Sequence, residues 1–92
     1  MDTAALPGHE LIETGLADLR AGRETIEALL VAIGAPRLRR LGLDLPEHLP
    51  ELPEHRLYDL LEQDSSDSAH SRYNALIRRL VSFERAAECV NR

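Results

Sequence analysis

The segment from Ala69 to Val90 carries an apolar residue at every third or fourth position, and this pattern constrains the fold more than any other. The spacing runs 4-3-4-3-4-3, the heptad repeat of a helix that buries one continuous stripe. The members of this heptad seam are Ala69, Tyr73, Leu76, Leu80, Phe83, Ala87 and Val90. We therefore expect a long helix over 69–90, with Ile77 widening its apolar stripe.

Leucine dominates the apolar residues, with seventeen leucines against two tyrosines, one phenylalanine and no tryptophan. Leucine and alanine are strong helix formers, whereas strands favour aromatic and β-branched residues. The 92 residues of the chain suffice for one hydrophobic core but not for two. The composition therefore predicts a single all-α domain over 1–92.

Two helices are expected in the first third of the chain, over about 8–21 and 23–33. Both segments repeat apolar residues with helical spacing and are followed closely by a glycine. Gly15 lies inside the first helix, where glycine costs about 1 kcal/mol against alanine, and this suggests that a neighbouring helix approaches closely. The second helix is apolar on most sides, so we expect it to be the most buried.

A Gly/Pro corner over 34–42 follows, with a short helix at 36–41. Three prolines within 43–53 exclude a long helix there, and one more helix is expected over 53–63. The leucines expected to hold the connector to the core are Leu43, Leu45, Leu49 and Leu52. The expected architecture is a small irregular four-helix bundle with a long heptad-patterned C-terminal helix.

The net charge of −5 argues against a general nucleic-acid or anionic-membrane binder. All eleven basic residues are arginine, which reflects either coding bias in a GC-rich genome or a preference for the planar guanidinium at an interface. Residues 1–35 carry six acids and two arginines, and 57–68 carry four acids and no base, whereas 69–92 carry five arginines and two acids. We expect the acidic front half of the chain and the basic last helix to attract each other within the fold.

One cysteine, Cys89, excludes an intrachain disulfide, and the chain does not open on a basic-plus-apolar signal segment. The longest apolar run, Ala28–Ile33, is far shorter than the ~20 residues of a membrane span. We therefore expect a cytoplasmic protein.

The corner suggests a helix-turn-helix over 25–42, because a helix, a glycine turn and an arginine-rich segment follow one another. Arg37, Arg39 and Arg40 are the candidate nucleic-acid contacts. The second segment is shorter than most recognition helices, however, and the overall charge is negative. A bundle corner whose arginines pair with local acids such as Asp44 and Glu47 is the preferred interpretation.

The heptad seam gives the main functional hypothesis. A long helix that outreaches its neighbours would leave Phe83, Ala87 and Val90 projecting, and a second chain would cover them. The predicted oligomer interface consists of Tyr73, Leu76, Leu80, Phe83, Ala87 and Val90. The alternative is that the seam packs against helices of the same chain.

Other chemistry finds little support in the sequence. His9, His48 and His55 lack the two-to-five-residue spacing of zinc ligand pairs, so no metal is expected. The polar cluster His70–Asn74 resembles a solvated first helical turn, and no motif for catalysis or a cofactor is present. The sequence predicts a helical interaction module without enzymatic activity, an adaptor or regulatory subunit of bacterial type. Its expected partner is a second copy, as a homodimer, or another helical protein, with a DNA-binding regulator as the alternative.

Overall fold

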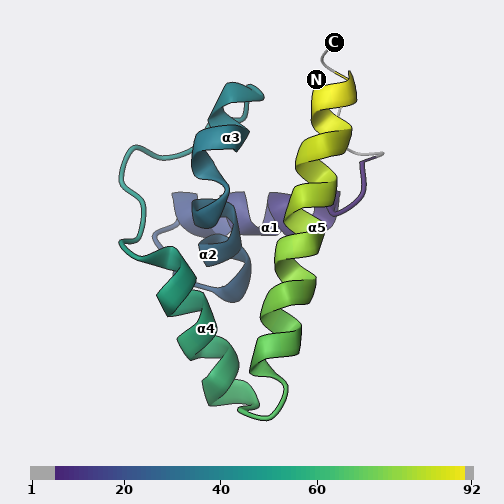
Figure 1. Cartoon of the computed structure of the whole chain (residues 1–92). Coiled ribbons are helices and arrows are strands. Elements are labelled where there is room, and N and C mark those ends of the chain that lie inside the picture. Colours follow the sequence, from purple (N-terminus) through teal and green to yellow (C-terminus); the bar gives the residue numbers. More distant parts are fainter. Residues whose placement is uncertain (1–5, 91–92) are drawn as a thin grey trace.

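The computed structural model describes residues 6–90, which form five helices and no strand (Figure 1). The helices are α1 (His9–Arg20), α2 (Ile26–Ile33), α3 (Ala35–Arg40), α4 (Pro53–Asp64) and α5 (Ala69–Val90). The predicted all-α class is confirmed. Four longer helices and the short α3 correspond to the expected irregular bundle with its corner.

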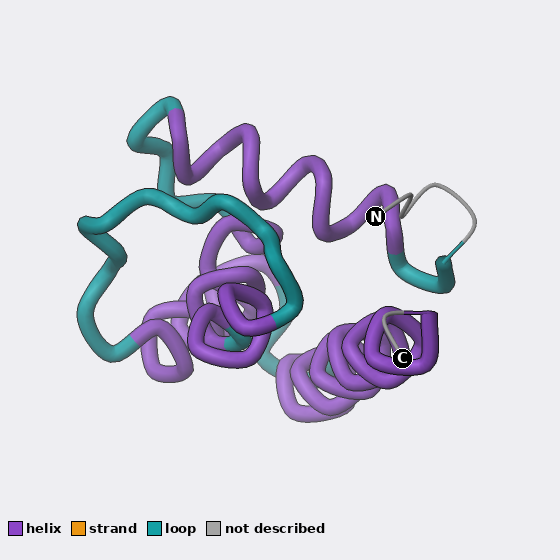
Figure 2. Tube along the Cα trace, turned by 90° about the horizontal axis from the view of Figure 1, so that it is seen from above, coloured by secondary structure: helices purple, strands orange, loops and turns teal. Residues whose placement is uncertain are grey.

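The apolar α2 lies at the centre and contacts α1, α3, α4 and α5. Its residues Ala28–Ala32 are all buried, as the sequence predicts. The helix begins after Thr25, whose side-chain oxygen accepts a hydrogen bond of 3.1 Å from the backbone N–H of Ala28. Around this centre, α1 runs crosswise to the other helices, whereas α4 and α5 flank α2 (Figures 1 and 2).

A glycine permits the close crossing of α1 and α2. A Cβ atom at Gly15 would meet the backbone carbonyl of Glu27 and Cγ2 of Val31. Only a residue without a side chain fits here, so the expected close approach at Gly15 is confirmed. The crossing buries Ile12, Leu16 and Leu19 of α1.

The corner between α2 and α3 differs from its prediction. Gly34 alone separates the two helices, and α3 stacks above α2 in Figure 1 and overlaps it when seen from above in Figure 2. The break at Gly34 and the short helix after it are as predicted, but the chain does not turn sharply at this point. The physical reason is that Gly34, with φ −86° and ψ 3°, stays near helical geometry, and Pro36 starts the next helix at once.

The connector between α3 and α4 is held to the core by only part of its leucines. Leu41 and Leu45 are buried, and Leu43 and Leu49 pack partly against the core. Leu52 is 67% exposed, so its expected packing role was wrong. Its backbone has φ 49° and ψ 53° at the start of α4, which turns the side chain into solvent.

The long α5 packs against α4, to which a short loop joins it, and against α2. Its bounds are those that the heptad pattern predicts. The buried apolar residues of α5 are Ala69, Leu80, Phe83 and Ala87. The α5 helix therefore closes the core of the chain along most of its length.

Candidate interaction surfaces

Most arginines are held by partners within the chain. The ion pairs that fix arginines to single acids join Arg23 to Asp18 at 2.8 Å, Arg56 to Glu24 at 2.5 Å and Arg72 to Asp64 at 2.5 Å. Arg20 and Arg39 instead donate to the backbone carbonyls of Asp44 and Pro46. Among residues 6–90, no ion pair joins an arginine of α5 to an acid of the first 35 residues, and the acidic 57–68 segment contributes the pair of Arg72 and Asp64.

Three arginines of α5 are not held in this way. Arg78, Arg79 and Arg85 are exposed, and no ion pair or hydrogen bond of their side chains is present among residues 6–90. Arg78 and Arg85 are seven residues apart, so they lie on one side of the helix, with the small, exposed Ser82 between them. We call Arg78, Arg79 and Arg85 the basic face.

The basic face borders shallow hollows beside the start of α1. Arg78 and Arg79 line one of about 290 Å³, and Arg79 also lines a second of about 270 Å³ together with His9 and Glu10. Small residues form much of the floor of the first, including Gly8 and Ala75. The backbone of a partner helix could therefore approach α5 closely between the arginine side chains.

Arg37 lies in a different setting from the one predicted. Its Nε donates a 2.5 Å hydrogen bond to Oε1 of Glu88, and its Nη1 lies 3.5 Å from Oε1 of Glu84. The expected pairing of the corner arginines with Asp44 and Glu47 is therefore wrong for Arg37, because stacking α3 above α2 turns this side chain towards α5. Burial raises the pKa of Glu84, which is 4% exposed, and the charge of Arg37 partly offsets that rise.

The candidate nucleic-acid contacts are only partly available. Arg37 is half-buried in its ion pairs, and Arg39 donates a 2.7 Å hydrogen bond to the carbonyl of Pro46. Arg40 is exposed. The first residues of α3, which a recognition helix would direct at bases, lie against α5, because a Cβ at Gly34 would sit 2.9 Å from Leu80. The structure thus gathers no arginine surface around α3.

The heptad seam lies mostly inside the chain. Leu80, Phe83 and Ala87 are buried at 3%, 1% and 0% exposure, and Tyr73 and Leu76 are partly buried against the same core. The expectation that Phe83 and Ala87 project beyond the bundle was wrong, because α1 reaches this part of α5: Phe83 Cβ lies near Gly8 at the start of α1. Val90, at 57% exposure, is the one member of the predicted interface that is well exposed.

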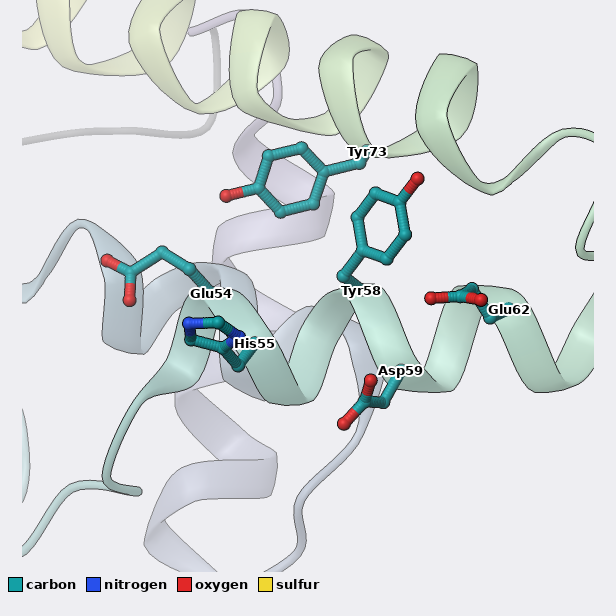
Figure 3. Close-up of a pocket in the computed structure, with 6 residues that line it drawn as sticks. All are labelled: Glu54, His55, Tyr58, Asp59, Glu62 and Tyr73. Carbon is teal, nitrogen blue, oxygen red and sulfur yellow. The ribbon is translucent and has the colours of Figure 1, made fainter.

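A pocket of about 330 Å³ opens between α4 and α5, and sequence reasoning had not found it. Its lining residues are Glu54, His55, Tyr58, Asp59, Glu62 and Tyr73 (Figure 3). The rings of Tyr58 and Tyr73 face each other across the helix pair, with centroids 5.7 Å apart and planes inclined by 55°. Burial raises the pKa of the Tyr73 hydroxyl, and the charge of Glu54 adds to this rise. We call this site the two-tyrosine pocket.

One signal in the sequence could have revealed this pocket. Tyr58 and Tyr73 are two of the three aromatic residues, and they stand at nearly equal distances before and after the loop at 65–68. Two antiparallel helices joined by a short loop bring such positions side by side. Glu54 and Glu62 then follow as neighbours of Tyr58, four positions before and after it on the same helix.

The remaining candidates from the sequence are scattered. His9 and Glu13 lie 3.9 Å apart on α1, and His70 contacts Asn74 at 3.2 Å. Across the part of the chain that the structure describes, no three His, Cys, Asp or Glu side chains are grouped to hold a metal ion. Cys89 is exposed near the end of α5.

The fold and surfaces define an all-α domain with a basic face and an acidic, aromatic pocket. No family model, no curated protein and no solved structure significantly matches the chain. None of the helices within residues 6–90 combines the length and apolarity needed to cross a membrane.

Proposed function

We propose that this chain is a small helical interaction module, an adaptor or regulatory subunit, that self-associates through α5. The observation that carries the proposal is the basic face. Arg78, Arg79 and Arg85 share the exposed surface of one rigid helix and are not engaged by acids of residues 6–90. Most other arginines described above are held within the fold, so these three are available to a partner.

The contact surface is the exposed side of α5 and not its buried seam. The neighbouring residues Ala75, one turn before Arg78, and Ser82, between Arg79 and Arg85, are small and exposed. A partner helix can therefore pack between the arginines without displacing a large side chain. Arginine is also enriched at protein interfaces, because its planar guanidinium can donate two parallel hydrogen bonds to one carboxylate.

Complementary surfaces favour a second copy of the chain as the partner. Two copies repel each other through their net charge of −5, but the exposed acids on α4 offer the opposite sign to the basic face at close range. Complementary charge speeds association and fixes register, and it weakens as salt screens it. Self-association through the basic face should accordingly fall with ionic strength.

Light scattering on a sizing column tests the proposal. The wild-type chain should exceed monomer mass at high micromolar concentration and low ionic strength, and should shift towards monomer in high salt. The variant with Arg78→Gln and Arg85→Gln should be monomeric with its helical content kept, because glutamine is also a good helix former. A matched control, Arg39→Gln with Arg40→Gln, removes the same charge from α3 and should associate like the wild type. A monomeric wild-type chain would contradict the proposal.

A further inference from the structure

The two-tyrosine pocket has the chemistry of a site for a guanidinium group. Tyr58 and Tyr73 offer two inclined ring faces, and Glu54 and Glu62 place carboxylates on either side of them (Figure 3). His55 and Asp59 also line the pocket, but the Asp59 carboxylate points away from the rings. A guanidinium stacks on aromatic faces and pairs its N–H groups with carboxylates, so it uses both kinds of wall at once. All basic side chains of this chain other than histidine are arginine.

No arginine of the same copy fills the pocket among residues 6–90. Arg56 of α4 pairs with Glu24, and Arg72 of α5 pairs with Asp64. The basic face points elsewhere, because the five residues from Tyr73 to Arg78 turn the side-chain direction by about 140° around the helix axis. Only a second molecule can bring an arginine of the basic face to this pocket.

We propose that the two-tyrosine pocket of one copy receives an arginine of the basic face from a second copy. The inference rests on the proposed function and names the surface that α5 meets. Its basis is charge complementarity. Three arginines without a partner among residues 6–90 face outward on one side, and an acidic, aromatic pocket that no arginine of these residues lines opens on another. The pocket and Arg78 lie about 140° apart around α5, so one two-fold interface cannot include both surfaces reciprocally. The contact is therefore heterologous, and successive copies form a ring or an open chain instead of the homodimer that the sequence suggested.

The two sides of such a contact can be disabled separately. The α5 variant carries Arg78→Gln and Arg85→Gln, and the pocket variant carries Glu54→Gln and Glu62→Gln. All four side chains are exposed, so both variants should keep their helical circular dichroism. The control for the pocket variant is Asp44→Asn with Glu47→Gln, which removes two exposed carboxylates of the connector, away from both the pocket and the basic face.

Each variant alone should weaken self-association at least about tenfold, which corresponds to about 1.4 kcal/mol. An equimolar mixture of the two should then form a 1:1 complex and nothing larger. The reason is that one intact contact remains, between the pocket of the α5 variant and the basic face of the pocket variant. The control pair should associate like the wild type.

The outcomes separate the inference from the proposed function. If the pocket variant associates like the wild type while the α5 variant is monomeric, the pocket assignment is wrong and self-association through α5 stands. If both variants associate like the wild type, or if the wild type is monomeric, the pocket assignment and the proposed self-association through α5 are both wrong. Two monomeric variants whose mixture stays monomeric would overturn the heterologous contact.

A second pair of variants tests the role of the rings without changing charge. Tyr58→Phe keeps a stacking surface and should leave the association constant within about twofold of the wild type, whereas Tyr58→Leu should lower it several-fold. Circular dichroism before each measurement establishes that α4 and α5 are still folded. Equal association of the Phe and Leu variants would contradict stacking of a guanidinium on this ring.

Discussion

Arg37 on α3 donates a 2.5 Å hydrogen bond to Glu88 on α5, a residue 51 positions further along the chain. The same guanidinium lies 3.5 Å from the buried carboxylate of Glu84. Close by, Gly34 faces Leu80, so the start of α3 also lies against α5. Arg37 therefore links the short α3, whose Ala35 and Leu38 are buried in the core, to the C-terminal half of the longest helix.

The buried Glu84 should give the stability of the chain a distinctive pH dependence. Burial holds the pKa of its carboxyl above the ordinary 4.5, so the folded state binds this proton more tightly than the unfolded state. The contribution of Glu84 to the free energy of unfolding is then fully present at acid pH and falls as the pH rises through the folded-state pKa. Urea unfolding of Glu84→Gln across this range should show its stability increasing relative to wild type as the pH rises. An unchanged difference at all pH values would contradict the raised pKa; Glu10→Gln, on the exposed side of α1, serves as the control.

Asp18 should show the opposite dependence. Hydrogen bonds from the Thr25 hydroxyl at 2.6 Å and from Arg23 at 2.8 Å lower its pKa below the ordinary 3.8. Its stabilising contribution is then present at neutral pH and is lost as the pH falls through the folded-state pKa. Asp18→Asn should lower the urea midpoint at neutral pH, because the Thr25 cap of α2 loses its charged partner, and the loss should vanish in acid. Asp44→Asn, which changes an exposed carboxylate, should have little effect at either pH.

Local patterns allowed much of the fold to be predicted from the sequence. The apolar spacing of 69–90 gives α5 with its observed bounds, and Gly15 indicates the close helix crossing. Each of these two predictions depends only on the sequence of a single helix. The stacking of α3 on α2 and the exposure of Leu52 were missed, because each depends on one backbone geometry that the apolar pattern does not encode.

The candidate surfaces were less accessible to prediction because they depend on what each side chain meets after folding. Arg37 and Arg78 have the same chemistry, yet Arg37 is held by acids of a distant helix, whereas Arg78 is exposed and has no such partner among residues 6–90. Phe83 fits the heptad pattern equally well in an oligomer interface or in an intrachain core, and burial by α1 decides between them. The spacing of residues within one helix predicts neither the partner of an arginine nor the surface that covers Phe83.

The crossing of α1 and α2 should not tolerate a methyl group. Gly15→Ala would place a Cβ against the carbonyl of Glu27, a backbone atom that cannot rotate away. We expect a loss of about 1–3 kcal/mol in the free energy of unfolding, since this overpacking exceeds the helix-propensity gain of alanine. Urea unfolding measures the loss. Thr14→Ala, one position earlier and exposed, should change stability by less than about 0.5 kcal/mol; equal effects at the two positions would contradict the close approach.

The burial of Phe83 makes a quantitative prediction about the heptad seam. Phe83→Ala should cost about 3–5 kcal/mol, because it empties a fully buried site. Phe83→Glu should unfold the chain by burying a charge without a partner. Val90→Ala, at the exposed end of the same seam, should change stability by less than about 0.5 kcal/mol. Thermal and urea unfolding followed by circular dichroism compare the three, and a folded, monomeric Phe83→Glu chain would return the seam to the role of an oligomer interface.

Leu52 should be replaceable with a gain in stability. Its φ of 49° lies in the left-handed region, where a residue with a Cβ costs roughly 1–2 kcal/mol, whereas asparagine tolerates this conformation. The side chain is 67% exposed, so little packing is lost on substitution. Leu52→Asn should therefore raise the free energy of unfolding by about 1 kcal/mol, which corresponds to a rise of about 4–8 °C in Tm for a domain of this size. Glu51→Asn, at the neighbouring exposed position without a positive φ, should not raise Tm. A fall in Tm for Leu52→Asn would mean that contacts of the leucine side chain outweigh the backbone strain at the start of α4.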